Sequence, residues 1–168
     1  MKMLGMRCVA VGFTLALALP LLAQQTRLDD FKARFEKETD PIRRAKLIEK
    51  LGDFQFDQIR QQLGAGNIEQ GLSTLAGYRD ECASLHKLLR GMGVDAERKP
   101  AGFKQLEFSV RESLGRLQEI MAGLTRDDQQ RFGTVRNELE TLDRELIQEL
   151  FPRQSKVANN ASNKPPEH

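Results

Sequence analysis

The sequence predicts an all-α protein, built as an antiparallel up-down bundle of four long helices with a shorter helix at its N-terminal end. Apolar residues recur with the 3.6-residue period of a helix along most of the chain, and no stretch alternates apolar and polar residues over the length of a strand. The helix-favouring residues Leu, Glu, Gln, Arg and Lys are abundant, whereas Val and Ile are few. A chain of 168 residues has room for one such domain.

The segment 1–23 has the layout of a secretory signal peptide. Lys2 and Arg7 make a positive start, an uncharged apolar run follows as far as Leu22, and the small residue Ala23 precedes two glutamines. The apolar run is shorter than the ~20 residues that span a bilayer. We therefore expect cleavage after Ala23, export to the periplasm or out of the cell, and no membrane span in the mature protein.

Cleavage would leave a mature chain with as many basic as acidic residues, because Lys2 and Arg7 account for the whole excess of positive charge. The basic residues form no sustained stripe, which argues against nucleic acid as the partner. The mature chain keeps one cysteine, Cys82, so no internal disulfide is expected and core packing must supply the stability.

Five helices are predicted within the expected domain, residues 24–152. The first covers about 27–38, with Thr26 as its N-cap. The second begins at Asp40 and Pro41, a capping residue followed by the proline that favours a first helical turn, and runs to about 63. Its apolar face is broad enough to contact more than one neighbour. The third helix, capped by Asn67, covers about 68–90.

The fourth helix begins near Pro100 and runs to about 122, with a narrow apolar seam. The fifth follows the capping residue Thr125 and runs to about 151. Its apolar residues lie three and four apart, as in a coiled coil: Phe132, Val135, Leu139, Leu142, Leu146 and Leu150. Glu–Arg pairs four residues apart are expected on solvated faces: Glu107–Arg111, Glu112–Arg116 and Glu140–Arg144. Residues 153–168 have almost nothing to bury and are expected to form a disordered polar tail.

Three polar residues, Arg79, Cys82 and His86, share the apolar face of the third helix. A polar group among apolar neighbours needs a partner. One interpretation is a small polar pocket, or a metal site built around Cys82 and His86. The other is that each side chain is satisfied by a neighbouring helix, which is the commoner case. Two ligands do not complete a metal site, and the second histidine of the chain, His168, lies in the tail.

Motifs for catalysis or cofactor binding do not occur in the sequence. It has no Glu-x-x-His pair for a di-metal bundle, no Cys-x-x-Cys-His for haem, no Gly-x-Ser-x-Gly and no phosphate-binding loop. We therefore expect no enzyme activity, no cofactor and no metal. Tyr78 to Glu81 are interpreted as an ordinary charged face. Phe108, an aromatic residue outside the apolar seam of its helix, is the candidate surface contact.

Three resemblances to known families are carried by short patterns. Residues 66–72 (Gly-Asn-Ile-Glu-Gln-Gly-Leu), with Leu75 and Tyr78, resemble the start of a tetratricopeptide helix pair in a single copy. Residues 124–129 (Leu-Thr-Arg-Asp-Asp-Gln) are similar to the Leu-Thr-x-x-Gln motif of periplasmic chaperones of the Spy and CpxP type, with the glutamine one residue later. The patterns at 103–107, 111–117 and 149–152 resemble uncharacterised exported helical proteins of bacteria, which implies an exported helical domain and no activity.

Three hypotheses about function follow from these observations. The favoured one is a non-enzymatic exported helical protein that binds another protein or an envelope component. The second is a Spy/CpxP-like chaperone that holds unfolded clients. The third is a binder of a small molecule or metal around Arg79, Cys82 and His86.

Overall fold

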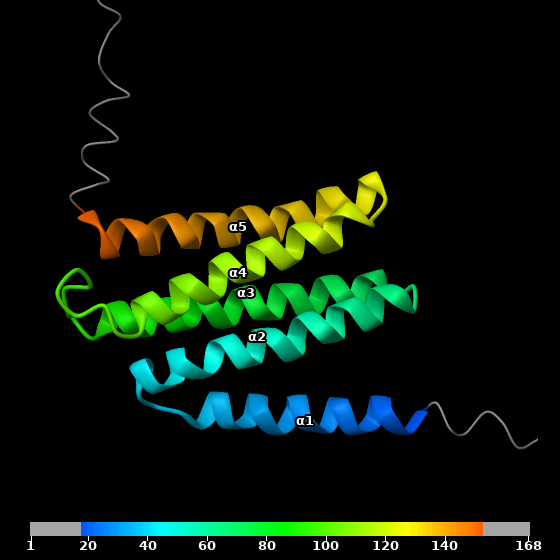
Figure 1. Ribbon diagram of the computed structural model, residues 1–168, viewed down its shortest axis with the longest axis horizontal. Coiled ribbons are helices and arrows are strands. Elements are labelled where there is room, and N and C mark those ends of the chain that lie inside the picture. Colours follow the sequence, from blue (N-terminus) through cyan, green and yellow to red (C-terminus); the bar gives the residue numbers. More distant parts are fainter. Residues whose placement is uncertain (1–17, 153–168) are drawn as a thin grey trace, which may run out of the picture.

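The structure, a computed structural model, describes residues 18–152. These residues form five α-helices and no strand: α1 (Ala18–Lys37), α2 (Pro41–Gly64), α3 (Ile68–Gly91), α4 (Phe103–Ala122) and α5 (Arg126–Leu150). Figure 1 shows the helices lying side by side, with α1 at one edge and α5 at the other. The predicted all-α class is confirmed. Within the described part of the chain, no helix combines the length and the apolar character needed to cross a membrane.

The N-terminal helix starts earlier than the sequence predicted. α1 begins at Ala18, so Thr26 lies inside it and is not its N-cap. Residues 18–25 are mostly Leu, Ala and Gln, which favour a helix, and Pro20 falls in the first turn, where its missing N–H costs little. Nothing therefore ends the helix before Thr26. The expected leader lies outside the described residues up to position 17, and the expected tail, 153–168, lies outside them entirely.

Side-chain caps fix the starts of α2 and α5 as predicted. The Asp40 carboxylate accepts the backbone N–H of Arg43 at 2.9 Å. The Thr125 hydroxyl accepts the N–H of Asp128 at 3.3 Å and donates to the Asp128 carboxylate at 2.6 Å. Asn67 does precede α3, but its side chain makes no capping hydrogen bond, so the predicted role of that side chain is wrong.

α4 begins at Phe103, three residues later than the predicted start near Pro100, and the preceding Gly102 sets this start. Gly102 has φ of +87°, and a Cβ at this position would lie 2.5 Å from the Leu89 side chain, so glycine is required on two grounds. The Gly102 N–H donates to the side-chain oxygen of Gln105 at 2.6 Å, which is half of a capping box. The close approach to Leu89 also brings the end of α3 against the start of α4.

The core lies among α2, α3, α4 and α5. α2 contacts α1, α3 and α4, which confirms the prediction that its broad apolar face has more than one neighbour. α5 contacts α3 and α4, and the six apolar residues predicted as its seam are all buried. Each helix therefore stabilises the others chiefly by burying a leucine-rich face.

α1 is packed into the same core cluster through α2. Leu28 and Phe35 are buried, and the Phe31 ring lies 5.5 Å from the ring of Phe54. The guanidinium of Arg44 lies 4.4 Å from the centre of the Phe35 ring, a cation–π contact. The sequence had left open whether this helix belongs to the core, and the structure places it there.

Two of the three predicted Glu–Arg pairs form. Arg111 contacts Glu107 at 2.8 Å and Arg116 contacts Glu112 at 2.6 Å. In the third case Glu140 instead pairs with Arg136 at 3.0 Å, while Arg144 donates to the hydroxyl of Thr141. Glu107 is 6% exposed, so it does not lie on a solvated face as predicted. The reason is that α4 packs against α2, α3 and α5 together, which covers more of its circumference than a narrow seam.

Candidate functional site

The three polar residues predicted on α3 have separate surroundings. Cys82 is fully buried in the core, and His86 is 5% exposed. Arg79 is more accessible and pairs with Asp80 at 2.8 Å and with Glu138 of α5. None of the three lines the hollows described below. The structure therefore does not assemble Arg79, Cys82 and His86 into one polar pocket.

The Cys82 thiol is sealed in the core. Burial raises its pKa to about 12, because the charged thiolate is disfavoured away from water. A thiol in this state is a poor nucleophile and a poor metal ligand. Across the described residues, no group of three or more His, Cys, Asp or Glu side chains is placed to hold a metal ion.

The remaining polar side chains of this face pair with α5. From one end of the interface to the other, Glu69 contacts Arg131 at 2.6 Å, Arg79 contacts Glu138, and His86 Nε2 lies 3.0 Å from the carboxylate of Glu149. Arg90 contacts the same Glu149 at 3.3 Å. We call these pairs the α3–α5 seam. These contacts satisfy the polar side chains of α3 by links to α5, as in the second of the two interpretations given for Arg79, Cys82 and His86.

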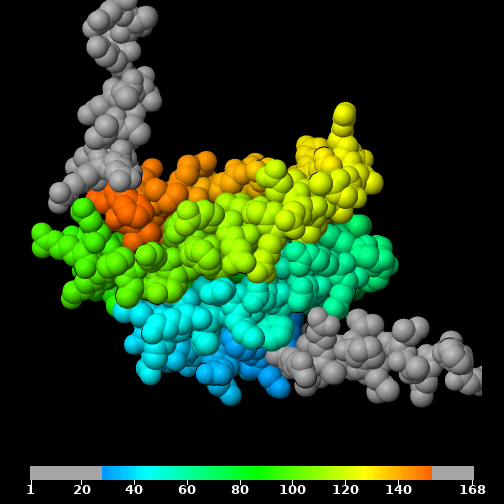
Figure 2. Space-filling view, viewed as in Figure 1, coloured from blue at the N-terminus to red at the C-terminus, as the bar shows by residue number. Residues whose placement is uncertain are grey.

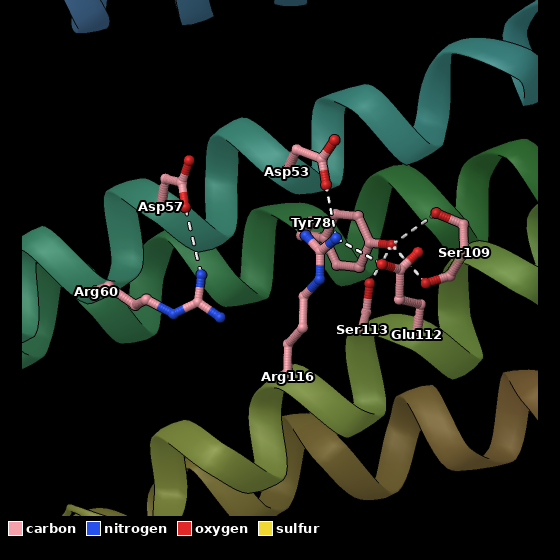
Figure 3. A network of polar contacts seen from close by, with 8 residues as sticks. All are labelled: Asp53, Asp57, Arg60, Tyr78, Ser109, Glu112, Ser113 and Arg116. Atoms are coloured by element: carbon pink, nitrogen blue, oxygen red, sulfur yellow. Dashed lines mark hydrogen bonds and ion pairs between the residues drawn. The ribbon is translucent and has the colours of Figure 1, made fainter.

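A buried hydroxyl cluster lies between α3 and α4, and the sequence analysis missed it. The Ser113 hydroxyl donates to the Tyr78 hydroxyl at 2.7 Å, and the Ser109 hydroxyl lies 3.3 Å from the same oxygen (Figure 3). Both serines and the tyrosine are buried, and burial raises the pKa of Tyr78 well above its ordinary value. Tyr78 is therefore a core residue, and its interpretation as part of a charged face is wrong. Its spacing of three residues from Leu75 and four from Cys82 places it on the buried face of the helix.

The packing around Tyr78 depends on small and aromatic neighbours in α2. A Cβ added at Gly52 would lie 3.2 Å from the Tyr78 ring, closer than ordinary packing allows. The Phe56 ring meets the Tyr78 ring edge-on, with centroids 5.6 Å apart. The cluster thus joins three helices at the middle of the core, and its enclosure marks it as structural.

Next to this cluster, Arg116 of α4 links two carboxylates. Its guanidinium contacts Asp53 of α2 at 2.7 Å and Glu112 at 2.6 Å (Figure 3). Asp57 and Arg60 make a second contact within α2 at 3.3 Å. All five charged groups have a partner in one of these two sets, and the Arg116–Asp53 contact ties α2 to α4.

The exposed surface of α4 is the strongest candidate for a functional site. Phe108, predicted as a surface contact, is 52% exposed, although an aromatic ring is normally buried. It borders a hollow of about 310 Å³, which we call the α2–α4 hollow. The lining residues are Ala45, Lys46, Glu49, Lys104, Gln105 and Phe108. Figure 2 shows this side of the molecule, with α4 lying between α2 and α5.

A second hollow, of about 460 Å³, lies on the other side of α4. This α4–α5 hollow is lined by Glu97, Pro100, Lys104, Glu107, Arg111, Ile147, Leu150 and Phe151. Ile147 and Phe151 are large apolar side chains that remain exposed, as Phe108 does. Lys104 borders both hollows. The two hollows therefore flank Lys104 across the first half of α4, and we call them together the α4 face.

Two of the four charged residues that line the α4–α5 hollow, Glu107 and Arg111, neutralise each other. The buried carboxylate of Glu107 accepts hydrogen bonds from Arg111, with distances of 2.8 and 2.9 Å. One turn before Ile147, burial raises the pKa of Asp143, and one of its carboxylate oxygens is buried without a hydrogen-bond partner. The other four lining residues, Pro100, Ile147, Leu150 and Phe151, give the hollow an apolar wall, and apolar walls with convergent polar groups are typical of binding surfaces.

The residues behind two of the local resemblances have structural roles here. The Gln129 side-chain amide donates to the backbone oxygens of Met121 and Leu124, at 3.0 and 3.1 Å, and so caps the C-terminal end of α4. A Cβ at Gly71, in the segment similar to a tetratricopeptide start, would lie 3.0 Å from the side chain of Leu63. Comparisons of the chain with protein-family models, with curated proteins and with solved structures found no match.

Proposed function

We propose that the protein is a non-enzymatic, exported helical-bundle protein that binds another protein through its α4 face. In this proposal α2 to α5 form an up-down bundle and α1 covers the outer side of α2. The observation that carries it is the group of exposed apolar side chains, Phe108, Ile147 and Phe151, beside two hollows that share one wall. Apolar side chains gathered around concave surface are a common mark of a protein contact.

The contacts of the other polar groups support a structural role for them. Arg79, His86 and Glu149 link α3 to α5, and Arg116 links α4 to α2. The one cysteine of the described residues is buried, with a raised pKa. These groups stabilise the fold, because each contacts other residues of the same chain and none lines the α2–α4 hollow or the α4–α5 hollow.

Site-specific photocrosslinking tests the proposed surface. A benzophenone amino acid replaces Phe108 in one variant and Gln118 in another, because Gln118 is an exposed residue of the same helix outside both hollows. After irradiation of cells that produce the protein, we expect the same cross-linked partner repeatedly from position 108 and none from position 118. Equal adducts from both positions, or none from position 108, would contradict the proposal.

Export is tested on the same material. Mass spectrometry of the protein recovered outside the cytosol should give a chain that begins at Gln24. A chain that retains Lys2 and Arg7 would contradict the expected cleavage, and recovery from the cytosol alone would contradict export.

A further inference from the structure

The two hollows of the α4 face lie on either side of a lysine that has no ion pair. Among the described residues, the nearby Arg111 and Arg116 are each paired with carboxylates, whereas no carboxylate lies within ion-pair distance of the Lys104 ammonium group. Lys104 is exposed and stands in the first turn of α4, where the aligned peptide dipoles add further positive potential. The centre of the α4 face is therefore suited to a negatively charged group.

Apolar walls lie beyond this lysine in both directions. Phe108 and Ala45 bound the α2–α4 hollow, and Pro100, Ile147 and Leu150 bound the α4–α5 hollow. With volumes of about 310 and 460 Å³, each hollow has room for a large apolar side chain. Burial of such side chains would supply most of the binding free energy, and the charge would supply orientation.

The acidic residues around the face limit the kind of anion that fits. Glu49 lines the α2–α4 hollow, together with a second exposed lysine, Lys46, and Glu97 lines the α4–α5 hollow. A polyanion such as a nucleic acid would meet a carboxylate in each hollow as it extended beyond Lys104. A single carboxylate at the centre, with neutral apolar groups on both sides, meets no such repulsion.

We propose that the α4 face binds a peptide segment of a partner protein that carries one acidic side chain between two large apolar side chains. The carboxylate pairs with Lys104, and the apolar side chains enter the two hollows. This inference rests on the proposed function and specifies the chemistry of the partner. It requires no change in the backbone of the described residues, because both hollows are present in the unbound chain.

Selection from a displayed library of random peptides, on the purified full chain, tests the inference. We expect enriched peptides to share an Asp or Glu between two large apolar residues. A fluorescent synthetic peptide with the enriched sequence is then titrated, alongside the same peptide with its acid replaced by the corresponding amide. The amide version should bind at least about tenfold more weakly, as expected for the loss of a charge pair that orients the ligand.

Variants of the protein identify the surface. Lys104→Glu should weaken binding of the acidic peptide by at least about tenfold and should favour a peptide whose acid is replaced by lysine. Phe108→Ala and Ile147→Ala should each weaken binding several-fold. Lys87→Glu is the matched control, because Lys87 is an exposed lysine of α3 outside both hollows, and it should leave affinity unchanged. Circular dichroism of each variant checks that the fold is retained.

The outcomes separate this inference from the proposed function. Enriched peptides without an acid, or binding that is indifferent to Lys104→Glu but sensitive to Phe108→Ala, would overturn the inference and leave the α4 face as a protein-binding surface. Failure to enrich any peptide would also overturn it, and the photocrosslinks from position 108 would still decide the proposed function. A dimer in sedimentation experiments that Phe108→Ala dissolves would assign the face to a second copy and overturn the inference.

Discussion

The Tyr78 hydroxyl is the clearest case of one atom on which several helices depend. It belongs to α3, is bonded to Ser109 and Ser113 of α4, and lies above Gly52 of α2. Tyr78→Phe keeps the ring but leaves two buried serine hydroxyls with one partner fewer. We expect a loss of about 1–3 kcal/mol in the free energy of unfolding, the usual cost of unsatisfied buried polar groups, measured by urea denaturation.

A double-mutant cycle is the control for this prediction. Ser113→Ala removes the donor, and the double variant Tyr78→Phe, Ser113→Ala removes both sides of the bond. Because the two groups interact directly, the double variant should be less destabilised than the sum of the two single changes, by about 0.5–3 kcal/mol. Strict additivity would show that the hydrogen bond contributes nothing to stability.

Glycines inside the helices should respond to alanine according to the space beside them. At Gly77, no atom lies within 4 Å of an added Cβ, so Gly77→Ala should stabilise α3 by about 0.5–1 kcal/mol through helix propensity. At Gly52 the added Cβ would lie 3.2 Å from the Tyr78 ring, so the gain in propensity should be offset by crowding. Urea denaturation of both variants measures the difference, and equal gains at the two positions would contradict this account.

The buried thiol predicts a loss of stability at alkaline pH. From its ordinary pKa of 9.0 up to about 12, Cys82 keeps its proton in the folded chain and loses it in the unfolded chain. Unfolding therefore becomes more favourable as the pH rises through this window, by up to ~1.4 kcal/mol per pH unit. Tyr78 is present in both proteins, so the comparison isolates the thiol, and between pH 8 and 10 Cys82→Ala should have a flatter profile than the wild type. Parallel profiles in urea denaturation would show that the thiol does not titrate on unfolding.

At the scale of helices, most boundaries follow from local signals. Two helix starts are predicted by capping residues in the sequence, Asp40 before Pro41 and Thr125 before Asp128. Both capping residues form the expected hydrogen bonds. The starts of α1 and α4 could not be predicted in the same way. α1 continues through Thr26 because the residues before Thr26 favour a helix and none of them ends it. α4 begins only after Gly102, because the backbone there packs against Leu89, which is distant in the sequence.

The candidate site was predictable only in part, for the same reason. Phe108 could be identified because its position in the sequence of α4 already places it outside the apolar seam of that helix. Ile147, Phe151 and Lys104 did not, because their significance comes from two hollows that form only when three helices and a loop meet. The pattern Arg79, Cys82, His86 left two interpretations open, because Glu138 and Glu149, the partners of Arg79 and His86, belong to α5 and are not apparent from α3 alone.

The turn between α4 and α5 depends on one glutamine. Gln129→Glu keeps the size of the side chain but removes the amide that donates to the carbonyl oxygens of Met121 and Leu124. We expect it to cost about 1–3 kcal/mol, more than Gln129→Ala, because a carboxylate against carbonyl oxygens is repelled. Gln130→Ala, the exposed neighbour, is the control and should change stability by less than about 0.5 kcal/mol. Thermal unfolding measures all three, and equal effects at 129 and 130 would rule out this capping role.

At the scale of the molecule, the structure separates buried phenylalanines, such as Phe35, from Phe108 and Phe151, whose rings are exposed. Phe35 is fully buried between α1 and α2, so Phe35→Ala should cost about 3–5 kcal/mol. Phe108→Ala should change the free energy of unfolding by less than about 0.5 kcal/mol, because its ring is mostly in water. Urea denaturation of the two variants measures both values, and a large loss at Phe108 would make that residue structural.

The same Phe35 variant tests whether α1 unfolds with the rest of the chain. The Cys82 thiol lies in α3 and reacts with a disulfide reagent only when the core opens. Since α1 is linked to α3 by the ion pair of Lys32 with Glu81 at 3.1 Å and shares the core cluster, we expect Phe35→Ala to speed this reaction. Loss of helical signal and exposure of the thiol should coincide along a urea gradient. An early helical loss with Cys82 still protected would instead make α1 a separately docked element, and the core of α2 to α5 would then be stable without it.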